Sequence, residues 1–335
     1  MVRVIETTLV GRVTGAGSFS RTDERFGIHG TDLGILWDGG DGRVFVLFGD
    51  TYGRGWGGDG AGPGDADWRF NALGFSTDRD LSKGLHLDSV VARGDGKADQ
   101  ILVAGSGWRH EVTVIPNGGI AVEGKQYIQY MSVHEWVPAG GWTTNYAGIA
   151  VSEDGGETWS KPRRARWKNT RAHDHPFQMG AFARDGDHVC LLGTTNGRFG
   201  GAHLARVSPS DILEPAAYEY WTANGWARDE FAAVPVIDGP VGELSVAYNV
   251  HFGQWFAMHL DEDRAAIVLR TADRLEGPWT PGEVVVSGRD YPALYGGYLH
   301  PWALDGDEIY FLLSQWGPYN VFLMRSRLDD ATVNG

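Results

Sequence analysis

The stretch HGTDLGILWDGGDGRVFVLFGDTY, residues 29–52, decides the fold. Apolar runs at 33–37 and 44–48 flank a Gly-Gly-Asp-Gly segment, and strand-forming residues on both sides of such a turn predict a β-hairpin. A three-residue loop pairs positions whose numbers sum to 82, which sets Asp32 opposite Asp50 with Cβ atoms about 5 Å apart. A two-residue loop instead pairs Asp32 with Gly49 and turns the two carboxylates to opposite faces.

Asp32 and Asp50 lie close together in either register. Neighbouring carboxylates repel each other when both are ionised, so such a pair serves as an acid–base couple or as a metal site. The alternative is that both residues only cap strand ends, which is a common role of Asp in turns.

Hairpin-like segments recur along the chain, and each is followed by a further strand-like stretch. Comparable positions stand 57 to 83 residues apart, at Asp32, Ile115, Gln178, Glu243 and His300. Units of four short antiparallel strands at this spacing are typical of a β-propeller, and five such units fill residues 1–335. The sequence therefore predicts an all-β fold, a five-bladed β-propeller that forms one domain. Helical periodicity is nearly absent, with one short helical turn expected within residues 209–217.

The innermost strand of each propeller blade lines the axis, so polar residues on those strands converge on one funnel. The candidates on innermost strands are Asp32, Gln178, Glu243 and His300, with Asp50, Asn145 and Gln315 nearby. A buried charge must be paired or used, so Glu243 is either a site residue or half of a salt bridge between blades. His300 is a core histidine, a ligand contact or an axial metal ligand, and structural hydrogen bonding is the alternative for the three amides.

Aromatic residues suggest that the ligand is a sugar. The chain has 14 Trp, and sugar faces stack on flat rings, although core packing accounts for most of these residues. Residues 54–64 form a glycine-rich loop after Asp50, in which Trp56 is either a sugar platform or part of a mobile surface loop. The predicted substrate-binding residues are His29, Trp56, Asn145, Gln178, Glu243, His300, Gln315 and Trp316.

Charge and composition exclude several classes of partner. The formal net charge of −14 disfavours nucleic acid and anionic membranes and suits a neutral substrate. The single cysteine, Cys190, stands in an apolar run and is expected to be a buried small hydrophobe. No apolar run reaches membrane-spanning length, and residues 1–10 lack the pattern of a secretory signal, so no membrane insertion is expected.

Two motifs mark the fold rather than the chemistry. Residues 152–159, SEDGGETW, match the Asp-box of sialidases and other propellers, in which Ser and Asp close an outer hairpin and Trp packs between strands. Residues 275–279, LEGPW, resemble an outer-strand turn of five-bladed glycosidases.

The chain resembles the domain-of-unknown-function family 4185, part of which is classed as glycoside hydrolase family 183, the endo-D-arabinanases. The matching stretches are FGIHGTDLG (26–34), LFGDTYG (47–53), YMSVHEW (130–136), TNYAGIA (144–150), GPVGELSVAYN (239–249), YGGYLHPW (295–302) and SQWGPYNVFLM (314–324). The resemblance implies an enzyme that cuts internal α-D-arabinofuranosyl linkages of arabinogalactan and lipoarabinomannan. For such a substrate we expect an extracellular or cell-wall-directed protein, and we favour a monomer while leaving the oligomeric state open. The resemblance also implies that Asp32 and Asp50 are catalytic and that no cofactor is required, with a structural Ca²⁺ left open.

Glycoside cleavage needs one carboxylic acid and one carboxylate, which Asp32 and Asp50 can supply. Analogy with other five-bladed arabinan-cleaving enzymes favours inversion at the anomeric carbon. One alternative pairs an Asp32 base with a Glu243 acid, as in glycoside hydrolase family 43, and another is a lectin-like propeller that binds cell-wall glycan without cleaving it. A sialidase is disfavoured, because the inner strands carry almost no arginine to bind a carboxylate.

Overall fold

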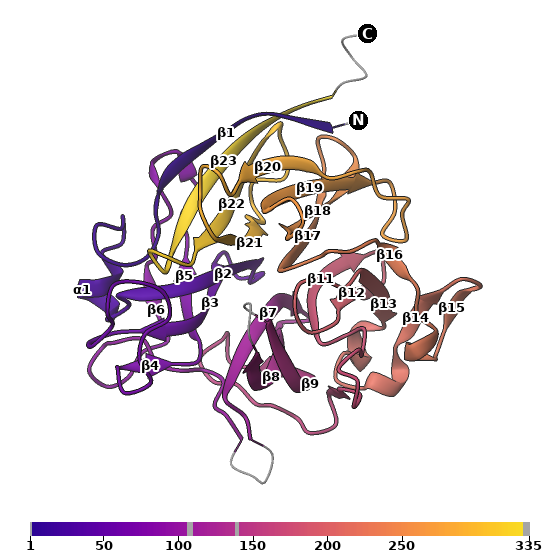
Figure 1. Cartoon of the computed structure of the whole chain (residues 1–335), viewed down its shortest axis with the longest axis horizontal. Helices are drawn as coiled ribbons and strands as arrows, with labels where there is room; N and C mark the ends of the chain where they lie inside the picture. Colours follow the sequence, from indigo (N-terminus) through magenta and orange to yellow (C-terminus); the bar gives the residue numbers. More distant parts are fainter. Residues whose placement is uncertain (1, 106–109, 138–140, 331–335) are drawn as a thin grey trace.

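The computed structural model describes residues 2–105, 110–137 and 141–330. Five small sheets surround a central axis, which confirms the predicted five-bladed β-propeller (Figure 1). Within these residues, none of the helices has the length and apolar character needed to cross a membrane.

The blades follow one another along the chain, each starting with its innermost strand. Blade one contains β2 (Gly30–Asp38), β3 (Val44–Tyr52), β4 (Trp68–Arg69), β5 (Ala72–Ser76) and β6 (Ser89–Val90). Blade two contains β7 (Thr113–Val122), β8 (Lys125–Val137), β9 (Gly141–Ser152) and β10 (Arg166–Lys168). Blade three contains β11 (Met179–Asp185), β12 (His188–Thr194), β13 (Ala202–Val207), β14 (Glu219–Thr222), β15 (Gly225–Ala227) and β16 (Pro235–Ile237).

Blade four contains β17 (Leu244–Asn249), β18 (Gln254–Asp261), β19 (Ala266–Ala272) and β20 (Glu283–Ser287). Blade five combines the two ends of the chain: β21 (Leu294–Leu299), β22 (Glu308–Gln315), β23 (Asn320–Asp330) and β1 (Val2–Arg12). The outermost strand β1 pairs antiparallel with β23, with Val2 opposite Asp330, and so closes the ring (Figure 1).

The first hairpin has the register that places Asp32 beside Asp50. The pairs Thr31–Thr51 and Trp37–Phe45 sum to 82, and Gly39 N–H donates to the carbonyl of Arg43 across a three-residue loop. The ladder is interrupted at Asp32, which faces both Gly49 and Asp50 because the next pair is Leu33–Phe48. Such a β-bulge increases the local twist and redirects side chains.

The bulge adds one residue to β3, and an extra residue on β2 directly afterwards restores the register. Leu33 and Gly34 have φ values of 65° and 91°, and the ladder resumes its original register at Ile35. A side chain as large as leucine rarely adopts a positive φ, so this backbone is strained next to Asp32.

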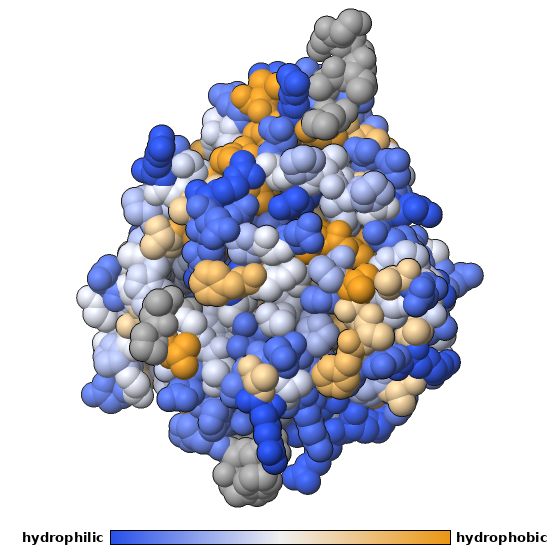
Figure 2. Space-filling view, turned by 45° about the vertical axis from the view of Figure 1, so that its right-hand side comes forward, coloured by the Kyte–Doolittle hydropathy of each residue, from blue (hydrophilic) through white to orange (hydrophobic). Residues whose placement is uncertain are grey.

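Side chains from one blade fill space against the next. The Trp37 ring lies directly on Gly119 of β7, where a Cβ atom would collide with it, and Trp37 Nε1 donates to Gln126 Oε1 at 2.8 Å. The surface seen in Figure 2 is mostly hydrophilic, with hydrophobic residues in separate small groups. The apolar side chains are buried mainly in core clusters within and between the blades.

Local motifs behave as expected. Thr158 donates to Asp154 through its hydroxyl, at 2.6 Å to Oδ2, and through its N–H, at 2.9 Å to Oδ1, and Ser152 Oγ lies 2.8 Å from Oδ1. These hydrogen bonds lower the pKa of Asp154 to about 2. Residues 209–217 hold two short 3₁₀ turns, η2 (Pro209–Asp211) and η3 (Pro215–Ala217).

Cys190 is buried, as expected for a small hydrophobic residue, and burial raises the pKa of its thiol to about 12. The sequence did not predict the five-residue helix α1 (Thr22–Phe26).

Candidate active site

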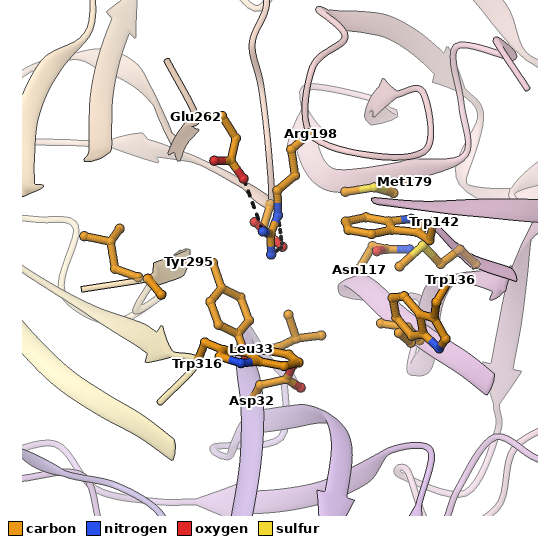
Figure 3. A pocket seen from close by; sticks show the side chains of 15 residues that line it. Asp32, Leu33, Asn117, Trp136, Trp142, Met179, Arg198, Glu262, Tyr295 and Trp316 are labelled. Atoms are coloured by element: carbon orange, nitrogen blue, oxygen red, sulfur yellow. Dashed lines mark hydrogen bonds and ion pairs between the residues drawn. The ribbon is translucent and has the colours of Figure 1, made fainter. Parts of the chain in front are cut away.

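A cavity of about 500 Å³ opens on the face where the innermost strands begin. Its apolar lining residues are Leu33, Ile115, Met131, Met179, Ala293 and Leu294. Its aromatic lining residues are Trp136, Trp142, Tyr295 and Trp316, and its polar ones are Asp32, Asn117, Arg198, Glu243 and Glu262 (Figure 3). A few convergent polar groups in a largely apolar hollow are typical of a binding or catalytic site.

Asp32 lies on β2 at the edge of this cavity and is partly buried. Its Oδ2 accepts hydrogen bonds from the hydroxyls of Tyr295, at 3.0 Å, and Tyr319, at 3.2 Å. Its Oδ1 is buried without a protein partner and lies so close to the Gly49 Cα that a Cβ there would collide with it. Burial raises the pKa of Asp32 to about 8, and the negative charge of Asp50 adds to the shift against the two tyrosine hydrogen bonds.

Asp50 lies next to Asp32 on β3, is only 8% exposed and does not itself line the cavity. Its Oδ1 accepts from Trp68 Nε1 and from Thr113 Oγ1, each at 2.9 Å. Burial raises the pKa of Asp50 to about 7, although both hydrogen bonds oppose the shift. Burial of these two neighbouring carboxyl groups therefore favours a protonated form of the pair.

Glu243 lies across the cavity, one residue before β17. Its Oε1 accepts from Arg198 Nε at 3.0 Å and Nη2 at 2.7 Å, and Arg198 Nη1 also donates to Glu262 at 3.2 Å (Figure 3). Burial alone lowers the pKa of Arg198, but the two carboxylates outweigh it and raise the pKa above the ordinary value. The Arg198 guanidinium also lies over the rings of Trp142 and Tyr295. Glu243 Oε2 is buried and unpaired, so this carboxylate has an acceptor left for a ligand.

The predicted amides do not line the cavity. Gln178 accepts from Thr144 Oγ1 at 2.7 Å and also donates to a main-chain carbonyl, so its amide is used within the fold. Asn145 and Gln315 likewise donate to main-chain carbonyls. Their contacts match the structural alternative considered for them.

His300 is on the opposite face of the ring, so the prediction that it shares the funnel with Asp32 is wrong. Leu294, the first residue of β21, lines the cavity, whereas His300 follows the last residue of that strand. His300 is fully buried, its Nδ1 accepts from Trp302 N–H at 3.3 Å, and burial lowers its pKa to about 4. Strand β21 runs along the axis from the cavity face to the opposite face of the ring, so Leu294 and His300 lie on opposite faces.

The remaining predicted residues are divided between the cavity and a second hollow. Trp316 lines the cavity and is 51% exposed, and its ring packs edge-to-face on Tyr319. His29 and Trp56 border a second, smaller hollow beside it. Among the residues that the structure describes, no group of three or more His, Cys, Asp or Glu side chains is placed to hold a metal ion.

Sequence reasoning missed several residues of the site. Tyr295 and Tyr319, which hold Asp32, stand within the stretches 295–302 and 314–324 that carry the family resemblance, so a signal was present. Arg198 stands in the glycine-rich loop between β12 and β13, outside any strand pattern. Nothing in the local sequence indicates that this loop reaches the axis.

Comparison with known proteins gives a family match and relatives in sequence and fold. The family model described as "Domain of unknown function (DUF4185)" matches residues 17–325. Notoamide biosynthesis cluster protein J of Aspergillus sp. (strain MF297-2) is 32% identical over 329 residues, covering 90% of this chain and 83% of that protein.

Two solved glycosidase structures share the fold. A family 117 glycoside hydrolase produced by the marine bacterium Zobellia galactanivorans superposes with a TM-score of 0.56 and 12% identity, over 98% of this chain and 92% of that one. An exo-beta-1,3-galactanase from Phanerochaete chrysosporium gives a TM-score of 0.58 and 11% identity, over 98% of this chain and 65% of that one. At such low identity, the likeness shows the fold alone.

Proposed function

Given that the chain belongs to the DUF4185 family, we propose that it is a glycoside hydrolase whose acid–base pair is Asp32 and Asp50. The observation that carries this proposal is the pair itself. Two carboxyl groups lie side by side on one hairpin, both have raised pKa values, and one of them borders the cavity. A binding site for a neutral ligand has no need of such a pair.

We assign the general acid to Asp32 and the general base to Asp50. Asp32 borders the cavity, and burial raises its pKa to about 8, so it can keep a proton near neutral pH and give it to the leaving glycosidic oxygen. Asp50 is the proposed base because Trp68 and Thr113 donate to its carboxylate and stabilise the charged form, and the attacking water must reach it past Asp32, since Asp50 does not line the cavity. Inversion at the anomeric carbon is proposed by analogy with five-bladed arabinan-cleaving enzymes, and it requires the water molecule to attack from the side of the sugar opposite the leaving group.

The proposed substrate is D-arabinan, cleaved at internal linkages outside the cell. This assignment is supported by the sequence stretches that resemble endo-D-arabinanases and by the exposed Trp136 and Trp316 at the cavity rim, which offer flat faces to sugar rings. Glu243, with one free carboxylate oxygen, is suited to accept a hydrogen bond from a sugar hydroxyl.

Product analysis tests the proposal. The protein is incubated with arabinogalactan and, separately, with plant L-arabinan, and the released sugars are separated by chromatography. We expect short oligosaccharides from D-arabinan only, with kcat lowered by about 10²–10⁴ in Asp32→Asn and Asp50→Asn. Release of single sugars alone, activity on L-arabinan alone, or near wild-type turnover by Asp50→Asn would each contradict it. Binding of arabinan without cleavage would identify a lectin.

An aryl arabinofuranoside separates the two roles. Its phenolate leaving group needs little protonation, so Asp32→Asn should recover much of its activity on this substrate, whereas Asp50→Asn should not. The opposite pattern would exchange the roles.

A second candidate function is acid–base catalysis on an apolar small molecule. It is favoured by the methionine- and leucine-lined floor of the cavity and by the relative named from a notoamide biosynthesis cluster. This candidate predicts binding of apolar aromatic compounds in the absence of sugar, detectable as quenching of tryptophan fluorescence.

A further inference from the structure

A second hollow of about 270 Å³ lies beside the cavity, on the same side of blade one. It is bordered by Trp56 and His29 together with Arg12 and Asp23. His29 immediately precedes β2, the strand that carries Asp32, so both hollows are anchored to one element.

A single loop joins the two hollows. Trp56 Nε1 donates to the carbonyl of Gly60 at 3.0 Å, and Gly60 N–H donates to the carbonyl of Gly317 at 3.0 Å. Gly60 also packs against the Trp316 indole, where an added Cβ would lie 3.0 Å from Nε1. The Trp56 ring in turn rests on Gly30, which has no room for a Cβ. One glycine therefore connects an indole of the second hollow to an indole of the cavity.

The chemistry of the second hollow suits a neutral, polyhydroxylated ring. It combines an indole with a guanidinium, a carboxylate and an imidazole, which are planar groups able to donate and accept paired hydrogen bonds. Arg12 and Asp23 have opposite charges, so the hollow has no strong preference for an ion. Arg12 Nε is buried without a partner, which leaves a donor for a ligand or an ordered water. The volume lies below the range of about 300–1,000 Å³ for sites that enclose a whole drug-sized ligand, which suits one sugar unit.

We propose that the second hollow is a distal subsite for the same glycan chain that enters the cavity, with the Trp56–Gly60–Trp316 contact as the bridge between them. This inference rests on the proposed glycoside hydrolysis. A chain that spans both hollows gains contacts which a short substrate cannot make, so the hollow makes the protein prefer long chains.

The test compares long and short substrates. For Trp56→Ala and for His29→Ala, we expect the ratio of kcat/KM on a long D-arabino-oligosaccharide to that on a short one to fall about tenfold, the effect of losing about 1.4 kcal/mol of binding. Phe231→Ala removes another exposed aromatic ring, on the outer part of blade three, and is the matched control that leaves the ratio unchanged. An unchanged ratio in both hollow variants would overturn the proposal.

A binding measurement separates this inference from the catalytic proposal. The Asp32→Asn protein is run through gels that contain soluble D-arabinan, alone and combined with Trp56→Ala or Phe231→Ala. We expect the polymer to retard the Asp32→Asn protein and its Phe231→Ala form, and to retard the Trp56→Ala form several-fold less. If the variants show this retardation pattern but the wild-type protein cleaves no glycan, the proposed hydrolysis is wrong and the distal subsite is supported. Equal retardation of all forms would disprove the distal subsite while leaving hydrolysis intact.

Discussion

Asp32 lies in an environment that favours its neutral form. Burial and the neighbouring Asp50 both raise its pKa, and only two tyrosine hydroxyls favour the carboxylate. A group of this kind is useful as an acid near neutral pH, but it destabilises the fold when it ionises.

Stability should therefore depend on pH through Asp32. Its pKa is about 8 in the folded protein against an ordinary value of 3.8, so between these values the folded state binds a proton that the unfolded state lacks. The stabilising contribution is complete below pH 4 and is lost as the pH rises towards 8. Asp32→Asn has no such loss, so we expect its advantage over the wild type in free energy of unfolding to grow from pH 5 to pH 8, by up to about 1.4 kcal/mol per pH unit. Urea denaturation at both pH values measures the difference, and an advantage of equal size at both would contradict the prediction.

Glu243 differs from Asp32 because its carboxylate is paired with Arg198. A carboxylate in an ion pair can still accept a hydrogen bond from a sugar hydroxyl, so we expect Glu243→Gln to raise KM by about tenfold with little change in kcat. Glu262→Gln removes the other carboxylate bound to Arg198 and controls for the loss of charge there. A loss of kcat as large as that of Asp32→Asn would favour the family-43-like alternative in which Glu243 is the acid.

At the scale of the element, the β2–β3 hairpin converts a local irregularity into a site. The bulge sets Asp32 against both Gly49 and Asp50, and the positive φ angles of Leu33 and Gly34 return the strand to register. In a regular ladder, the alternation of side chains along each strand alone would decide which face each carboxylate points to.

Gly49 is the position where this hairpin should be most sensitive. A Cβ atom there collides with Asp32 Oδ1, so Gly49→Ala must displace the carboxylate, and we expect kcat to fall by about 10²-fold while the protein remains folded. The control is Gly94→Ala, where a Cβ meets nothing within 4 Å. Circular dichroism checks the fold, and full activity in Gly49→Ala would show that the close approach is unnecessary.

The predictability of these features follows from how local they are. The first hairpin and the Asp-box depend on residues adjacent in sequence, and both were predicted, although the sequence left two registers open for the hairpin. His300 was misplaced because its face depends on where β21 ends, and Arg198 was missed because a loop from blade three reaches the axis only in the assembled ring. Contacts between residues of different blades can be recognised only once the whole fold is known.

At the scale of the whole molecule, the ring is closed by hydrogen bonds between β1 and β23. Strand β1 connects the start of blade one to the outer edge of blade five, so we expect the cavity residues on β2, β7 and β21 to depend on ring closure for their relative positions.

Removal of residues 2–12 should therefore destabilise the protein as a unit. The deletion exposes an edge of β23 and part of the blade core around Val2, and we expect the Tm to fall by about 10 °C or more. A synthetic peptide with the β1 sequence, added to the truncated protein, should raise the Tm again. A truncated protein with unchanged Tm would show that β1 is dispensable for closure.

The same seam determines how the ring responds to tension. Val2 and Asp330 are partners at one end of an antiparallel pair, so force applied between these residues loads that end of the ladder first. The hydrogen bonds then break one after another, as in unzipping, rather than all together as in shear. A pull on both ends should peel β1 from blade five at low force, before any other blade is loaded.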